Sequence, residues 1–519
     1  MSVFSYSDSA LSVIPPFLAI VLAIITRRVL VSLGAGIVIG SLLLTKFEFL
    51  NSASFLVKAV SELFWVDGAI NTWNLYILVF LILLGAITAI ITVSGSAKAF
   101  AQWARTRIKS KRHAKLLTMA LGVVIFIDDY FNSLVVGSVA RPLTDRYHVS
   151  RAKLAYLLDS TAAPICVISP VSSWGAYIIA LIGSILATHG MTNSSYLGTF
   201  VGMIPMNFYA IFSLLLLLSV AIFTFDIGPM RKHERNAQKG ELFDEKKGQP
   251  PGSLADLPEA DDGSVLGLFL PIVTLVAATL FFMVFTGAQT LEKESIEFSV
   301  IKAFEKTDVS LSLVLGALLG LITTFGLALK QKLSFSDISK ALVHGAKSML
   351  PAIYILLFAW TIAEVIGQLE TGKYLAHIAT GSIPFELLPA VMFALAGVTA
   401  FSTGTSWGTF GIMLPIAADM AMGSNSTMML PMLSAVLAGA VFGDHCSPIS
   451  DTTILSSTGA SCHHIDHVVT QLPYALIVAF ISLCGYLVLG FTQSVLSGFL
   501  TCTALFVVVF IYLKVQKSR

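Results

Sequence analysis

The sequence predicts an all-α protein that crosses a membrane about eleven times, and three observations lead to this prediction. Of the 519 residues, 56% are hydrophobic and 12% are charged, which is about half the charged fraction of a typical soluble protein. Apolar runs long enough to cross about 30 Å of hydrocarbon recur along the chain. The unusual polar clusters also come in two pairs, and each cluster lies within apolar sequence.

Eleven segments are long and apolar enough to be predicted spans. They are residues 11–26, 29–45, 75–97, 154–187, 199–225, 265–286, 309–329, 350–369, 429–456, 468–491 and 498–513. The first segment is not preceded by the basic region of a signal peptide and ends at Arg27 and Arg28. We therefore expect it to be a membrane span.

A further apolar stretch, residues 116–141, is predicted to be a re-entrant hairpin. The basic loops on either side of it, 105–115 and 141–153, both belong in the cytoplasm under the positive-inside rule. The chain between them must therefore enter and leave the membrane on the same side, with its turn near residues 127–130.

The same alternation makes residues 385–422 a second hairpin, which enters from the outside and turns near residues 402–406. In this register 26 of the 32 Lys and Arg residues lie on one side. We therefore expect a bacterial inner-membrane protein with its N-terminus outside and its C-terminus in the cytoplasm.

The predicted topology divides the chain into two repeats of opposite orientation, residues 1–225 and 264–497. Each has a re-entrant hairpin and a broken helix, the latter at 154–187 and 429–456, and residues 96–104 resemble 371–379. The charged linker 226–263, rich in Pro and Gly, is expected to be cytoplasmic with little fixed structure. Residues 498–519 add a helix and a tail. Inverted repeats of this kind are typical of secondary transporters, with the binding site at the repeat interface.

Two segments have the residues that a helix break inside a membrane requires. Pro164 and Pro170 bracket residues 165–169, and Gly443 and Pro448 bracket residues 444–447. Proline removes a helical hydrogen bond and glycine tolerates unusual backbone angles. Such a break needs burial in protein or contact with a watery cavity, and its free carbonyl oxygens suit Na⁺.

Asp128 and Asp129 form a pair of carboxylates at the tip of the first hairpin. A charged Asp at the centre of a bilayer costs about 2.5–3.5 kcal/mol, so a proton, a cation or an ion partner best explains its presence. In the alternative, the tip lies near the cytoplasmic surface and the pair is a solvated turn. Asn132 and Ser133 offer neutral oxygens, although an Asn that caps a short helix has the same appearance.

The densest polar set of the second half surrounds the second break. It consists of Asp444, His445, Ser447, Ser450, Asp451, Thr452 and Thr453. One carboxylate here could coordinate Na⁺ while another group exchanges a proton. Histidine titrates near neutral pH, so His445 is either a pH-sensitive element or a structural side chain that is hydrogen-bonded inside the broken helix.

The outer hairpin tip carries four hydroxyl groups, on Ser402, Thr403, Thr405 and Ser406. Small residues let two hairpin arms pack closely, but packing alone does not require hydroxyls, so contact with a substrate or an ion is favoured.

Several polar and aromatic residues are expected to be structural. Packing is the preferred role for Trp174 and Trp407, and a polar contact with another helix for Asp159. The role of Glu364 is left open. The three histidines at positions 463, 464 and 467 are expected on the solvated face of a cytoplasmic loop rather than at a metal site, and no transition metal is expected.

Three motifs resemble the NhaC-type Na⁺/H⁺ antiporter family within the ion transporter superfamily. They are GDHCSPISDTTILSSTG (443–459), STGTSWGTFGIMLPIA (402–417) and DDYFNSLVVGSVARPLTD (128–145). The resemblance covers about residues 75–490 without the linker. It implies an ion site at Asp128, Asp129, Asn132, Ser402, Thr403, Thr405, Ser406, Asp444, Ser447, Ser450, Asp451 and Thr452. The pattern STGTS…MLPIA also resembles the hairpin-tip motif of the dicarboxylate/sodium symporters in the wider superfamily, which implies alternating access of the elevator type and a homodimer.

The sequence thus predicts a transporter rather than an enzyme, most simply one that exchanges Na⁺ for H⁺. The alternative is a Na⁺- or H⁺-coupled carrier of a small organic solute, such as an amino acid or a carboxylate, including exchange of malate and lactate. The expected partners are Na⁺, H⁺ and the lipid bilayer, with no cofactor beyond the ions and no nucleic acid.

Overall fold

The structure is a computed structural model of the chain. It describes residues 4–518 except 27, 67, 127, 171, 192–194, 253–259, 261–262, 372–373, 375–382 and 425. Residue 127 at the predicted inner turn and most of segment 371–379 therefore lie outside the described residues.

The described chain is almost entirely helical, with one two-residue hairpin of strands, β1 (Trp65–Val66) and β2 (Ala69–Ile70). In the first half the helices are α1 (Ile14–Thr26), α2 (Val29–Leu44), α3 (Phe49–Glu62), α4 (Thr72–Val93), α5 (Ser96–Arg107), α6 (Lys111–Val124), α7 (Asp129–Arg146), α8 (Arg151–Cys166), α9 (Ser173–Thr188), α10 (Tyr196–Met203) and α11 (Phe208–Phe223).

The linker contains α12 (Pro229–Gln238), and the second half follows it. Its helices are α13 (Leu266–Lys293), α14 (Val300–Glu305), α15 (Val309–Lys330), α16 (Phe335–Gln368), α18 (Leu388–Thr403), α19 (Ser406–Ser424), α20 (Met429–Cys446), α21 (Asp451–Gly459), α22 (His464–Thr492) and α23 (Val495–Ser518). Short 3-10 helices lie at Ala10–Val13, Ile204–Met206, Glu245–Lys247, Phe385–Leu387 and Ser426–Met428.

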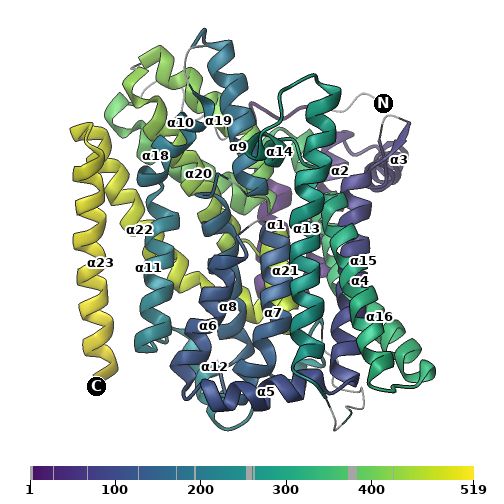
Figure 1. Ribbon diagram of the computed structural model, residues 1–519. Helices are drawn as coiled ribbons and strands as arrows, with labels where there is room; N and C mark the ends of the chain where they lie inside the picture. Colours follow the sequence, from purple (N-terminus) through teal and green to yellow (C-terminus); the bar gives the residue numbers. More distant parts are fainter. Residues whose placement is uncertain are drawn as a thin grey trace.

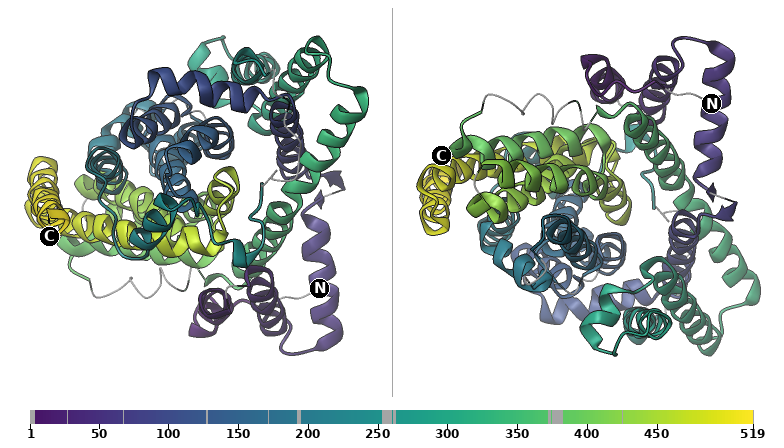
Figure 2. Two further views of the ribbon diagram at one scale, coloured as in Figure 1. Left: turned by 90° about the horizontal axis from the view of Figure 1, so that it is seen from below. Right: turned by 90° about the horizontal axis from the view of Figure 1, so that it is seen from above.

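The long helices form two groups that stand side by side (Figure 1, Figure 2). We call α6–α11 with α18–α22 the bundle, because these helices pack mainly on one another. We call α1–α4 with α13, α15 and α16 the frame, which curves along one side of the bundle in Figure 2. Helix α5 connects the two groups at the end of the molecule that also holds α12 and the C-terminus (Figure 1).

Eight helices of the described chain are long and apolar enough to cross a membrane. They are α4, α13, α15, α16, α18 with the turn before it, α20, α22 and α23. Helices α10 and α11 make a ninth if they are taken as one span, although they bend by 52° where a continuous span was predicted over 199–225. Within the predicted spans 11–26 and 29–45, the apolar helical segments are shorter.

Both predicted hairpin segments contain a pair of adjacent helices. Helices α6 and α7 meet at residues 125–128, and α18 and α19 meet at Gly404 and Thr405. Gly404 has φ +71°, and a Cβ there would lie 2.5 Å from the carbonyl oxygen of Ile449. This position therefore favours glycine, both for its backbone angle and for the close approach of the second break.

Polar side chains cap the first turns of three helices. These are α7, which follows the predicted turn of the first hairpin, and α9 and α21, which follow the two predicted helix breaks. Asp128, Ser172 and Ser450 accept hydrogen bonds from backbone N–H groups in the first turns of α7, α9 and α21. Such caps satisfy N–H groups that a helix start leaves without partners. The breaks themselves differ from the prediction: the first spans residues 167–172, so Pro164 lies inside α8, and the second spans 447–450, so Asp444 lies inside the last turn of α20.

The expectation that the linker has little fixed structure is wrong for residues 229–247. Helix α12 begins with Pro229 in its first turn and buries Met230, Glu234 and Ala237 against the bundle. These residues recur at the spacing of one helix face. Buried apolar contacts and the ion pair of Glu234 with Lys111 (2.6 Å) hold the helix in place.

Candidate functional site

A cavity of about 230 Å³ lies between the frame and the bundle. The frame contributes Trp73 and Asn74 of α4 with Ala359, Trp360 and Ala363 of α16. The bundle contributes Tyr130, Thr403, Gly404, Thr405, Trp407 and Asp451. The cavity is therefore lined by residues from both halves of the sequence and from both the frame and the bundle.

Asp451 is the carboxylate that lines this cavity, and its side chain is 7% exposed. Its Oδ2 accepts a hydrogen bond from the hydroxyl of Tyr130, and its Oδ1 accepts one from the backbone N–H of Thr452 at 2.8 Å. Tyr130 lies in the first turn of α7 and Asp451 in the first turn of α21. This contact joins the tip of the first hairpin to the second break.

Asp128 and Asp129 lie beside this contact and are buried, with 3% and 1% of their side chains exposed. Burial excludes the solvated turn that was the alternative for this pair. Asp128 accepts from the backbone N–H of Phe131 at 3.0 Å. The Oδ1 atom of Asp129 accepts from the indole N–H of Trp174 at 2.9 Å, while its buried Oδ2 has no hydrogen-bond partner among the described residues.

Asp444 connects the second break to the turn between α18 and α19, which was predicted to be the outer hairpin tip. Its Oδ2 accepts from the hydroxyl of Ser406 at 2.9 Å, and its Oδ1 accepts from that of Ser450 at 2.5 Å. Ser450 in turn lies 2.9 Å from the hydroxyl of Thr452. Ser447 donates to the carbonyl oxygen of Phe401 at 2.7 Å, so the break and the tip are joined twice.

The other residues that were predicted for the site differ in how they lie. Thr403 and Thr405 line the cavity, while Ser402 is buried beside them. Asn132 donates to the carbonyl oxygens of Gly122 (2.6 Å) and Ile125 (2.7 Å), so its amide holds the end of α6. Its buried Oδ1 has no partner among the described residues and is free to face a ligand.

The buried carboxylates of the site are held by neutral groups. No ion pair between described residues involves Asp129, Asp444 or Asp451, and the groups that donate hydrogen bonds to them are hydroxyls, an indole and a backbone amide. Burying a carboxylate without a counter-charge is costly. These groups therefore suit a bound proton or a bound cation.

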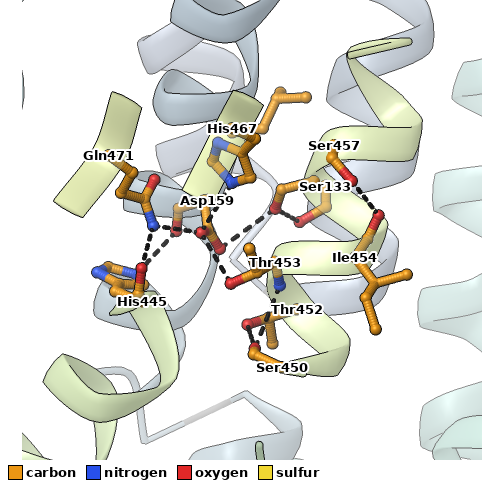
Figure 3. A network of polar contacts seen from close by, with 12 residues as sticks. Ser133, Asp159, His445, Ser450, Thr452, Thr453, Ile454, Ser457, His467 and Gln471 are labelled. Atoms are coloured by element: carbon orange, nitrogen blue, oxygen red, sulfur yellow. Dashed lines mark hydrogen bonds and ion pairs between the residues drawn. The ribbon is translucent and has the colours of Figure 1, made fainter. Parts of the chain in front are cut away.

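A second polar network lies deeper in the bundle, around Asp159 of α8 (Figure 3). Its Oδ2 accepts from Gln471 Nε2 at 2.5 Å and pairs with His467 Nε2 at 3.1 Å. Thr453 donates to the same oxygen at 3.4 Å, and Ser456 donates to Oδ1 at 3.3 Å. Asp159 thus makes the polar contact with other helices that the sequence predicted.

The position predicted for the histidines at 464 and 467 is wrong. Both are buried on α22, which begins at His464, whereas the predicted span begins at 468. A solvated loop was predicted because polar residues precede the apolar run, but these side chains are buried by α8 and α21. His445 is also buried, and its ring lies 3.2 Å from both the Tyr209 hydroxyl and the Asp159 carbonyl oxygen.

Sequence reasoning missed several residues of the site. Tyr130, Trp73 and Trp360 were not singled out, and Trp407, for which packing was expected, lines the cavity. Trp407 also packs against Trp174 and Tyr177, with ring centroids 5.8 and 4.9 Å apart. An aromatic side chain gives little indication of binding in the sequence. The position of Tyr130 directly after two carboxylates was nevertheless a signal that could have identified it as a residue of the candidate site.

Comparison with known proteins gives relatives of known and unknown activity. A protein of Haemophilus influenzae described as uncharacterized is 53% identical over 514 residues, which is 98% of this chain and 96% of the relative. The malate-2H⁺/Na⁺-lactate antiporter of Bacillus subtilis is 30% identical over 30% of this chain and 34% of its own length. The arginine/ornithine antiporter of Halobacterium salinarum is 35% identical over 35% of this chain and 37% of its own length.

The match to the two antiporters thus covers about a third of each. A family model is matched over a much longer part of the chain, residues 165–491, which include the second break, the turn between α18 and α19, and the Asp444 and Asp451 carboxylates. The model is that of the Na⁺/H⁺ antiporter family. With its eight apolar helices, the chain is a multi-pass membrane protein that belongs to this family of secondary transporters.

Proposed function

We propose that this chain exchanges Na⁺ for H⁺ across a bacterial inner membrane, at a site formed by the Asp128, Asp129, Asp444 and Asp451 carboxylates. The single observation that carries the proposal is a set of buried carboxylates, of which Asp451 lines a cavity and Asp129, Asp444 and Asp451 are held by neutral groups. A carboxylate in this setting is stable when it holds a proton or a cation. Competition between the two for the same carboxylates couples their transport.

Hydroxyl and carbonyl oxygens complete the ligand set that Na⁺ requires. The proposed ligands besides the carboxylates are Asn132, Ser402, Thr403, Thr405, Ser406, Ser447, Ser450 and Thr452. Na⁺ is a hard cation that prefers such oxygen ligands, and a break in a helix supplies carbonyl oxygens that are not used by the helix. In this proposal His445 is either a structural group or a pH-sensitive group of the site.

The proposed movement is alternating access of the elevator type. All four carboxylates and both hairpin tips belong to the bundle, while the frame supplies only one wall of the cavity. A bundle that moves as one body against the frame would therefore carry the whole ligand set with it. In this proposal α6/α7 and α18/α19 are re-entrant hairpins of two inverted repeats, within eleven spans.

The proposed orientation places α5, α12 and the C-terminus in the cytoplasm, because the basic loops gather at that end. The N-terminus then lies outside, as does the opposite end of the bundle (Figure 1). A homodimer is part of the proposal, and its mass in detergent measured by light scattering would test it.

A second candidate function is coupled transport of a small organic solute. A cavity of about 230 Å³ is larger than a bare Na⁺ needs, and four aromatic side chains, Trp73, Tyr130, Trp360 and Trp407, line it. Aromatic walls with a few polar groups are typical of sites for small molecules. The names of the two partly matching antiporters, for malate and lactate and for arginine and ornithine, support this candidate.

Proteoliposomes with an internal pH-sensitive dye test the proposal. Na⁺ added outside should drive proton efflux in the absence of any organic solute. Flux that appears only when an amino acid or a dicarboxylate is added would overturn Na⁺/H⁺ exchange in favour of the second candidate.

Substitution of the carboxylates tests the site separately. We expect Asp451→Asn and Asp129→Asn each to lower Na⁺-driven proton flux at least about a hundredfold, because loss of an interaction with a buried charge costs about 3–5 kcal/mol. Asp419→Asn is the matched control, because Asp419 is 71% exposed at the outer end of α19. Wild-type flux in both site variants, with normal insertion, would remove the carboxylate assignment.

A further inference from the structure

Three buried histidines surround the second break, and among the contacts of the described residues only the ring of His467 is within hydrogen-bond distance of a carboxylate. The ring nitrogens of His464 lie 3.2 Å from the Ser457 hydroxyl and 2.8 Å from the Pro448 carbonyl oxygen. His445 likewise contacts a hydroxyl and a carbonyl oxygen. A hydroxyl with a carbonyl oxygen is the partner set of a neutral imidazole, whose one N–H donates while the other nitrogen accepts.

His467 has a different set of partners. Its Nε2 lies 3.1 Å from Asp159 Oδ2, both side chains are completely buried, and its Nδ1 has no hydrogen-bond partner among the described residues. A proton bound at Nδ1 would turn the imidazole into an imidazolium whose charge Asp159 compensates directly. Such compensation is what a buried charge requires.

Among the groups that surround the pair, Asp159 is the carboxylate that contacts the His467 ring. The titratable groups that face Asp159 or His467 are Asp444, His445 and Cys446 from α20, His464 from α22, Tyr209 from α11 and Cys462 from the turn before α22. Helix α21 presents the hydroxyls of Thr453 and Ser456, and Ser456 in turn contacts Ser133 of α7. Asp451 begins α21, on the cavity side of these hydroxyls.

We infer that the Asp159–His467 pair is a proton-binding site of the transporter, separate from the Asp128, Asp129, Asp444 and Asp451 carboxylates. The inference rests on the proposed Na⁺/H⁺ exchange and adds a second place where protons oppose Na⁺. The proton is taken up at Nδ1 of neutral His467 and leaves from the same atom. Histidine is suited to this role because its charge changes between about pH 5 and 8.

The pair reaches the proposed Na⁺ site through short connections. Thr453 donates both to Asp159 Oδ2 (3.4 Å) and to the carbonyl oxygen of Asp444 (3.3 Å). Gln471 donates to Asp159 and, at 2.9 Å, to the carbonyl oxygen of His445, directly after Asp444. With His467 neutral, the charge of Asp159 adds to the negative field that attracts Na⁺; with His467 protonated, the pair is neutral and the attraction weakens.

The test is the pH dependence of Na⁺ binding, measured by the stabilisation that Na⁺ gives purified protein against thermal unfolding. Coupling between two sites commonly changes an affinity by about 5–150-fold. For the wild-type protein we expect the apparent Kd for Na⁺ to rise at least about fivefold as pH falls from about 8 to about 6. His467→Gln should make this rise smaller and leave the part that competition at the carboxylates contributes, whereas His464→Gln, the matched control, should keep the whole rise.

The outcomes separate the inference from the proposal on which it rests. Absence of Na⁺-driven proton flux in wild-type proteoliposomes would overturn the proposed function. Wild-type flux together with an unchanged pH profile in His467→Gln would overturn only the inference. If His467→Gln does not fold, the ¹⁵N-histidine spectrum of the wild-type protein decides. A buried imidazole whose titration midpoint falls when Na⁺ is added supports the inference, and the lack of one overturns it.

Discussion

At the scale of single residues, the site is defined by what holds its carboxylates. Trp174, Tyr130, Ser406 and Ser450 each donate one hydrogen bond to an Asp, and none of them carries a charge. Neutral donors orient a carboxylate without cancelling its charge. The site therefore keeps its attraction for a cation while the geometry of its oxygens stays fixed.

Tyr130→Phe tests this role of the neutral donors. The variant removes the hydroxyl that donates to Asp451 but keeps the ring in the cavity wall. A hydrogen bond to a charged group contributes about 1.5–3 kcal/mol, so we expect the KM for Na⁺ to rise about tenfold or more. Tyr177→Phe is the control, because the one hydrogen bond of its hydroxyl within the described part of the chain is to the Trp407 carbonyl oxygen, at 3.5 Å. Equal KM values in the two variants would contradict the prediction.

The sequence singles out acidic and hydroxyl residues for the proposed site but not their neighbours in the structure. An Asp or a run of hydroxyls in apolar sequence is unusual, because it is costly in a membrane, and Asp129 and Asp451 could be predicted for that reason. Tyr130 and Trp174 look like packing residues, since an aromatic ring has the same sequence pattern in either role. The histidine at 467 was misplaced because burial by other helices is not visible in local sequence.

At the scale of elements, the breaks and the linker show where local patterns succeed and fail. Proline and glycine located both broken helices, but the breaks begin at residues 167 and 447 rather than directly at Pro164 and Gly443. Proline is tolerated inside α8 because neighbouring helices and side chains satisfy the freed carbonyl groups. The linker was misjudged because its composition is that of a disordered segment, while α12 is held by contacts to distant parts of the chain.

Glu234 of α12 provides a test of how the linker is held. Burial by itself would raise the pKa of this carboxyl, but the ammonium groups of Lys153 and Lys111 lower it below its usual value. The stabilisation is therefore present above the ordinary Glu pKa of about 4.3 and is lost only as pH falls through the lowered value. Docking of α12 should stay constant from neutral pH down to about pH 5.

Limited trypsin digestion at Arg231, Lys232 and Arg235 measures this docking. Glu234→Gln removes the ion pair with Lys111, while Lys153 keeps its ion pair with Asp226 at 2.9 Å. Removal of one partner of a buried pair costs up to about 3–5 kcal/mol. We expect cleavage in α12 to become at least about tenfold faster. Glu241→Gln is the control, because Glu241 is exposed after the end of α12. Equal cleavage rates in the two variants would show that the ion pair does not hold the helix.

At the scale of the whole molecule, the division into frame and bundle decides what the protein can do. The sequence indicates two repeats and places a polar cluster in each, but it does not show that α4 and α16 form the opposite wall of the cavity. That wall depends on packing between helices far apart in the chain, such as α16 on α4 and α16 beside α21. A cavity wall that belongs to one body while the ligands belong to another is the arrangement that an elevator movement needs.

A pair of cross-links tests the movement directly. Trp73 of the frame and Trp407 of the bundle have ring centroids 6.1 Å apart, whereas Tyr177 and Trp407 both belong to the bundle. The background variant carries Cys484→Ser, because Cys484 is the one partly exposed cysteine of the described chain. In this background, each pair is changed to cysteines and joined by a short bifunctional methanethiosulfonate. We expect the Trp73→Cys/Trp407→Cys link to abolish Na⁺-driven proton flux until a reductant is added, because it fixes the bundle to the frame. The Tyr177→Cys/Trp407→Cys link should leave flux unchanged relative to the same variant before cross-linking, because both ends move together. Full flux through a molecule whose frame and bundle are cross-linked would rule out the elevator movement and would require the gates to open within a fixed bundle.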